Sequence, residues 1–69
     1  MLSELIIQAI VDGAMNAYAL KTGGRKGWCK EDIKEGVKAY GGSYEDFQNA
    51  KILALKTMME SAGVEHSFS

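Results

Sequence analysis

Cysteine and histidine are nearly absent from this chain of 69 residues, which contains one of each. A single cysteine cannot form a disulfide within the chain. Cys29 and His66 together supply too few ligands for a zinc site with three or four protein ligands. They also leave no nucleophile beside an oriented base, the arrangement that nucleophilic catalysis requires. We therefore expect no catalytic residue and no metal site, and we interpret Cys29 as a small, half-buried apolar side chain.

Paired carboxylates give no better prospect of an active site. Glu31, Asp32 and Glu35 lie close together in the sequence. A chain this short has little room for the deep apolar pocket that keeps two neighbouring carboxyl groups in different protonation states. Sequence motifs for binding nucleotides, haem, flavin or calcium are also missing. The sequence predicts that the protein is not an enzyme and has no cofactor.

The chain lacks an excess of charge and a long uninterrupted apolar run. Eight basic and nine acidic residues give a net charge of -1, too little to attract nucleic acid or an anionic membrane. Glu4, Asp12 and Asn16 interrupt the most apolar segment, which is near the lower length limit for spanning a bilayer. The first residues have no basic group before the apolar run and no cleavage site typical of a secretion signal. We expect a soluble, reduced, cytoplasmic protein without a membrane partner.

The segment 3–20 is apolar almost all the way round if it forms a helix. Its polar side chains recur every four residues and form one narrow ridge, Glu4, Gln8, Asp12 and Asn16. Ser3 is a suitable N-cap, and Gly23 or Gly24 can end the helix in a left-handed conformation. A surface helix needs only one apolar stripe. The pattern predicts a central helix from about residue 3 to 21 with neighbours on several sides.

Two further helices are predicted, over about 29–40 and 43–62. In the first, Ile33, Val37 and Tyr40 recur on one face, and the other face is charged and reads as solvated. The second begins with Ser43 and Asp46 at capping-box spacing and has an apolar arc of about 200°. Gly63 has the form of a helix stop, followed by a tail at 64–69.

We expect one all-α domain over residues 1–69, a small three-helix bundle assembled as a homodimer through the first and third helices. Domains of this size are marginal without disulfides, metal or oligomerisation. The expected core residues are apolar and recur at helical spacing: Ile6, Ile10, Val11, Tyr18, Ile33, Val37, Phe47, Leu55 and Met58.

Small side chains form a strip on the first helix, where Ala9, Gly13 and Ala17 follow one another at spacing four. Glycine in a helix interior costs about 1 kcal/mol relative to alanine, so Gly13 suggests the close approach of another helix. That helix belongs either to a crossing within the chain or to a second copy. Lys51, in the middle of the apolar arc of the third helix, either extends to solvent or pairs with an acid such as Asp12 or Glu4. We assign the dimer face to Ala9, Gly13, Ala17 and Lys51.

The glycine-rich segment 23–28 carries the only local cluster of positive charge, Arg25 and Lys26. We interpret this segment as a flexible connector. A phosphate-binding loop is the alternative, although the sequence signal for it is weaker. Trp28 is either a core anchor or an exposed binding residue. The candidate partner-binding residues are Arg25, Lys26, Trp28, Leu53 and Met59.

These features favour a protein–protein interaction module, a small regulator or inhibitor that binds and covers a larger protein. Short, stand-alone helical chains of this kind are often accessory proteins of phages and other mobile elements, which would place this one in a host cytoplasm. The alternative is a nucleic-acid-binding helix-turn-helix formed by the second and third helices, although Glu45 and Asp46 would then face the phosphates. A further alternative is a small structural or adaptor subunit.

Overall fold

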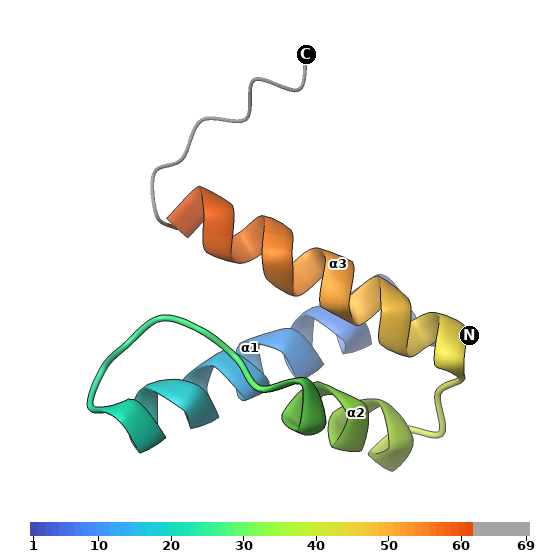
Figure 1. Ribbon diagram of the computed structural model, residues 1–69. Coiled ribbons are helices and arrows are strands. Elements are labelled where there is room, and N and C mark those ends of the chain that lie inside the picture. The colour runs from blue at the N-terminus through green and yellow to red at the C-terminus, as the bar shows by residue number, and fades with distance from the viewer. Residues whose placement is uncertain (62–69) are drawn as a thin grey trace.

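The computed structural model describes residues 1–61 and shows three α-helices and no strand in that range (Figure 1). Helix α1 covers Glu4–Thr22, α2 covers Lys30–Ala39 and α3 covers Tyr44–Ser61. In the view of Figure 1, α3 lies above α1 and α2, and each helix contacts the other two. The predicted three-helix fold is confirmed. The predicted stop at Gly63 and the tail at 64–69 lie outside the described residues.

The ends of α1 and α2 follow from the capping residues. The Ser3 hydroxyl accepts a hydrogen bond from the Ile6 N–H at 3.3 Å, as expected of an N-cap. Gly23 ends α1 with φ 75°, a left-handed conformation. At the end of α2, Gly41 has φ 72°, and the Gly42 N–H donates to the Val37 carbonyl at 2.8 Å. This is a Schellman motif, and the predicted glycine stop at the end of α1 is confirmed.

The core lies where the three helices meet. Its buried apolar residues are Ile7, Ile10, Val11, Ala14, Ile33, Val37, Phe47, Ala50 and Ala54. Ile10, Val11, Ile33, Val37 and Phe47 were expected there.

The other expected core residues are not fully buried, although Ile6 packs against the core. Leu55 is 55% exposed, so its assignment to the core was wrong. Ile6, Tyr18 and Met58 are only half-buried. The physical reason is that the inner face of α3 is formed by Ala50 and Ala54, whose small side chains fill the contact with the other helices. The helix consequently directs several of its large apolar side chains outward.

Closest packing between α1 and α2 occurs at Gly36. A Cβ atom added there would lie 2.7 Å from Cγ2 of Ile10, whereas one added at Gly13 would meet nothing within 4 Å. The interpretation of Gly13 as a helix crossing within the chain was therefore wrong. The glycine that permits a close approach is on α2.

Asp46 is fully buried, with 0% of its surface exposed. Its Oδ2 accepts hydrogen bonds from the Ser43 N–H at 2.9 Å and the Ser43 hydroxyl at 3.2 Å, and its own N–H donates to Ser43 Oγ at 3.3 Å. This reciprocal pair is the predicted capping box. Its Oδ1 accepts from the Leu2 N–H at 3.0 Å, a contact over 44 positions of sequence. The Ser43 N–H lowers the pKa of Asp46 below its ordinary value of 3.8, with help from the Leu2 N–H, and this outweighs the opposing effect of burial.

None of the helices in residues 1–61 combines the length and hydropathy that crossing a membrane requires.

The lowered pKa of Asp46 predicts a loss of stability in acid. Because the folded-state pKa lies below the unfolded value of about 3.9, the unfolded state binds more protons in the interval between them. The contribution of Asp46 is complete well above the unfolded pKa and disappears as the pH falls through the folded pKa. Thermal unfolding followed by circular dichroism should show Asp46→Asn melting below wild type at pH 7, with the gap closing below about pH 4. Glu35→Gln, at an exposed carboxylate on α2 away from the expected dimer face, is the control. If the difference in melting temperature between Asp46→Asn and wild type did not change in acid, the acid sensitivity would belong to another group.

Two glycine substitutions test the packing of α1 and α2. Gly13→Ala should raise the free energy of unfolding by about 0.5–1 kcal/mol, because alanine favours a helix and meets no neighbour. Gly36→Ala should lower it by about 1 kcal/mol, because overpacking against Ile10 exceeds the gain in helix propensity. Urea unfolding measures both. Equal effects of the two substitutions would contradict this packing.

Candidate interaction surfaces

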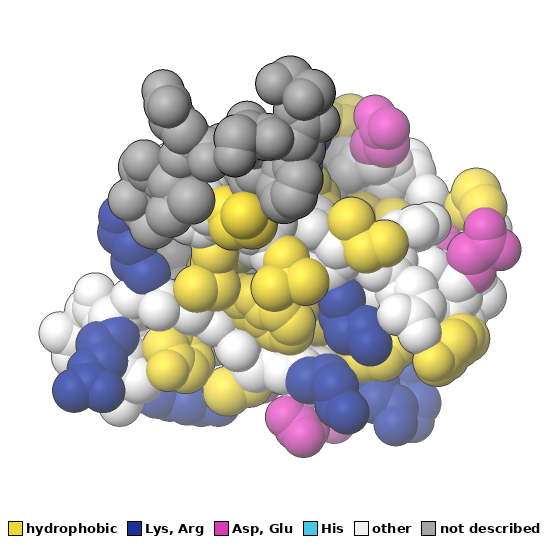
Figure 2. All heavy atoms as spheres, turned by 45° about the horizontal axis from the view of Figure 1, so that its top comes forward, with side chains coloured by type: hydrophobic (Ala, Val, Ile, Leu, Met, Phe, Trp, Pro, Cys, Tyr) yellow, Lys and Arg dark blue, Asp and Glu magenta, His cyan; other side chains and the backbone are white. Residues whose placement is uncertain are grey.

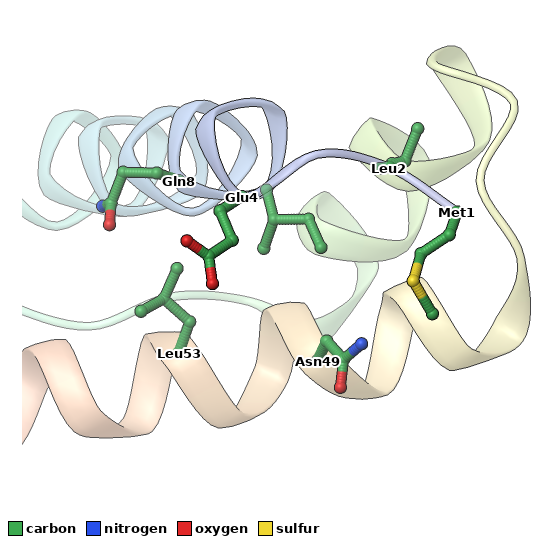
Figure 3. Close-up of a pocket in the computed structure, with 7 residues that line it drawn as sticks. Met1, Leu2, Glu4, Gln8, Asn49 and Leu53 are labelled. Carbon is green, nitrogen blue, oxygen red and sulfur yellow. The ribbon is translucent and has the colours of Figure 1, made fainter.

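A groove with a volume of about 540 Å³ separates the start of α1 from α3 (Figure 3). Its lining residues are Met1, Leu2, Glu4, Ile7, Gln8, Asn49 and Leu53. Figure 3 shows Glu4 of α1 directed toward α3, on the side of Leu53, with the Asn49 amide farther along α3. The Gln8 amide donates to Asp12 Oδ1 at 2.9 Å. The groove thus combines an apolar floor with one carboxylate and two amides, a lining suited to weak polar binding rather than to nucleophilic chemistry.

The three carboxylates that are close together in the sequence differ in exposure. Glu31 and Glu35 are exposed, while Asp32 is half-buried and lies 3.5 Å from Lys21 Nζ. This ion pair connects the end of α1 to the first turn of α2 and contributes at most about 1 kcal/mol, since Lys21 is largely exposed. In residues 1–61, no group of three or more His, Cys, Asp and Glu side chains could hold a metal ion. His66 lies outside the described residues.

Cys29 immediately precedes α2 and is half-buried. Its backbone carbonyl accepts from the N–H groups of Asp32 and Ile33, at 3.1 and 3.4 Å, while its side chain makes no capping bond. The interpretation of Cys29 as a half-buried small side chain is confirmed.

The three predicted partner-binding residues in the loop between α1 and α2 differ in how exposed they are. Arg25 and Lys26 are exposed, and the Arg25 N–H donates to Thr22 Oγ1 at 3.2 Å. Trp28 is half-buried and packs against the hydrophobic core. Between them, Gly27 passes over Tyr18 so closely that a Cβ atom would lie 2.5 Å from its Cε2. Of the two alternatives for Trp28, the structure favours the core anchor.

The two remaining partner-binding candidates are on α3. Leu53 is half-buried, packs against the core and lines the groove of Figure 3. Met59 is half-buried near the end of the described part of α3. Both residues are on α3, whereas Arg25 and Lys26 are in the loop between α1 and α2. The candidate partner-binding residues therefore belong to two different elements.

The predicted dimer-face residues also separate into two groups. On α1, Ala9 and Gly13 are exposed and Ala17 is half-buried. Lys51 is on α3, where its Nζ lies 4.6 Å from the centroid of the Phe47 ring, a cation–π contact. Within its own chain, Lys51 therefore interacts with an aromatic ring and not with Asp12 or Glu4. The spacing of four residues between Phe47 and Lys51 on one helix is the signal that could have predicted this contact, but Phe47 was assigned only to the core.

Large exposed apolar side chains mark the outer surfaces. On α1, Leu5 and Leu20 are 84% and 86% exposed, and on α3, Ile52 and Leu55 are 63% and 55% exposed. By helical periodicity, Leu5 and Leu20 share the outer face of α1 with Ala9 and Gly13. Figure 2 shows hydrophobic side chains gathered in the middle of one face of the molecule.

No protein family, curated protein or solved structure matches this chain. Any assignment of function therefore depends on the surfaces described above.

Replacing Trp28 tests the core-anchor interpretation. Trp28→Ala should lower the free energy of unfolding by about 2 kcal/mol, less than the 3–5 kcal/mol typical of a fully buried tryptophan, because the side chain is only half-buried. Chemical unfolding followed by circular dichroism measures the change. Arg25→Ala, in the same loop but exposed, should change stability by less than about 0.5 kcal/mol. A stable Trp28→Ala variant would return Trp28 to the candidate binding residues.

Proposed function

We propose that this chain is a non-enzymatic protein–protein interaction module that forms a homodimer and acts as a small regulator or inhibitor by covering part of a larger protein. The observation that carries the proposal is the exposure of large apolar side chains on the outer faces of α1 and α3, above all Leu5 and Leu20. Covering apolar surface gains roughly 25 cal/mol for each Å² removed from water. In a dimer, the outer face of α1 on one copy can cover the outer face of α3 on the other.

The outer face of α1 is suited to a second helix. Gly13 lies at its middle with nothing within 4 Å of its Cβ position, so a neighbouring backbone can approach closely there. Leu5 and Leu20 lie on either side along the helix and supply apolar contact area. Among residues 1–61, no neighbouring helix covers this position.

Charge favours a contact between α1 of one copy and α3 of the other. Asp12 is exposed on the outer part of α1, and Lys56 is exposed on α3, one turn after Ile52. An α1–α3 contact brings these opposite charges toward each other. A symmetric α1–α1 contact centred on Gly13 would instead bring the two Asp12 carboxylates together.

Gly13→Leu tests this proposal without disturbing the single chain. Since the Cβ position has no neighbour, the variant should keep the helical content and melting behaviour of a folded domain. A leucine there should block close helix approach and reduce the mass measured by light scattering after size exclusion from two chains to one. The control is Tyr40→Ser, which removes a side chain that is 56% exposed at the end of α2. A dimer that survives Gly13→Leu, or a wild type that is monomeric, would refute the proposed interface.

One observation favours the helix-turn-helix alternative. Asp46 is buried, so only Glu45 of the two carboxylates that argued against DNA binding is exposed at the start of α3. Duplex DNA should then bind in a salt-dependent manner, and substitution of Arg25 and Lys26 with glutamine should weaken the mobility shift. The exposed Glu45 and the net charge of -1 make this the second choice.

A further inference from the structure

A small pocket lies between α2 and the start of α3, away from the groove of Figure 3. Its volume is about 220 Å³, and its apolar part is formed by Val37, Tyr44 and Phe47. The rings of Tyr44 and Phe47 are tilted by 57° with centroids 6.1 Å apart. Pockets for drug-sized ligands usually measure about 300–1,000 Å³, so this one fits a single side chain.

Two lysines line the pocket, and a third contacts one of its aromatic rings. Lys34 and Lys38 of α2 line it, and Lys51 of α3 lies over the ring of Phe47. Lys34 and Lys38 are exposed and form no ion pair with any residue in the described range 1–61. They are also four residues apart on one helix, a spacing at which like charges repel.

No carboxylate lining the pocket neutralises these cations. Asp46 is buried and uses its oxygens on Leu2 and Ser43. Glu31 and Glu35 of α2 are exposed but are not among the pocket residues. The pocket therefore offers an apolar floor with two lysines and no carboxylate at its rim, and the complementary ligand is apolar in the middle and acidic beside it.

We propose that this pocket binds a short acidic segment of a partner protein, with one aromatic or aliphatic side chain against Tyr44 and Phe47 and carboxylates beside Lys34, Lys38 and Lys51. The inference rests on the proposed function and names the surface and the chemistry of its partner. Lysine provides a point charge suited to single carboxylates. An extended nucleic acid is disfavoured because binding a phosphate backbone needs a larger basic surface than three lysines near Glu31, Glu35 and Glu45 provide.

The test uses a short synthetic peptide with a central phenylalanine flanked by glutamates, titrated into the ¹⁵N-labelled full chain at low salt. Amide shifts should concentrate at Val37, Gly42, Tyr44 and Phe47, and binding should weaken at about 0.2 M salt. Substituting both Lys34 and Lys38 with glutamine should reduce affinity by about tenfold. The matched control substitutes Arg25 and Lys26 with glutamine, which removes the same charge from the loop and should leave affinity unchanged.

Several other outcomes overturn the inference. Equal binding of a peptide with glutamines in place of the glutamates would remove the role of charge. Loss of binding only in the loop variant would move the site to Arg25 and Lys26. Shifts caused by a duplex DNA and not by the peptide would favour the nucleic-acid alternative. Dimerisation is measured separately with Gly13→Leu. If the protein is a dimer but does not bind the peptide, only this inference is wrong. If the protein is a monomer and binds the peptide, only the proposed dimer is wrong.

Discussion

The carboxylate of Asp46 holds together three segments that are distant in sequence or differ in direction: the residues before α1, the turn after α2 and the first turn of α3. One oxygen accepts from Leu2 and the other from Ser43, and the group is fully buried. The turn leaves no space beside it, since a Cβ atom at Gly42 would lie 2.7 Å from Val37 and 2.8 Å from Leu2. A buried charge is tolerated only when its hydrogen bonds are satisfied, so this corner fixes where α2 and α3 lie.

The small side chains in the core determine what remains outside. Ala14, Ala50 and Ala54 fill the helix contacts. With these positions occupied by alanine, Leu5 and Leu20 on α1 and Ile52 and Leu55 on α3 face outward. The apolar surface that a larger core would have absorbed is consequently available for association, which is the basis of the proposed function.

Local structure was predictable from the sequence, whereas tertiary placement was not. Ser3, Ser43, Gly23 and Gly41 act within one or two turns of chain, and the helix limits they set agree with the structure to within about two residues. An apolar arc of about 200° on α3 does not reveal which part of the arc faces the core. Leu55 was therefore predicted to be buried, whereas in the structure Ala54 is buried and Leu55 is exposed. Gly13 and Gly36 look alike in sequence, and only the neighbours of each distinguish an open face from a crossing. Asp46 was recognised as a helix cap, but its bond to Leu2 depends on the folded chain.

We propose that the outer face of α1 is an association surface. The most direct measurement is the dependence of ¹⁵N–¹H amide shifts of the unmodified chain on its own concentration. Amide shifts should change with concentration along one side of α1, at Leu5, Ala9, Gly13 and Leu20, and on α3 near Ile52 and Lys56, while the amides of α2 stay constant. Spectra that do not change with concentration, or changes confined to α2, would contradict it.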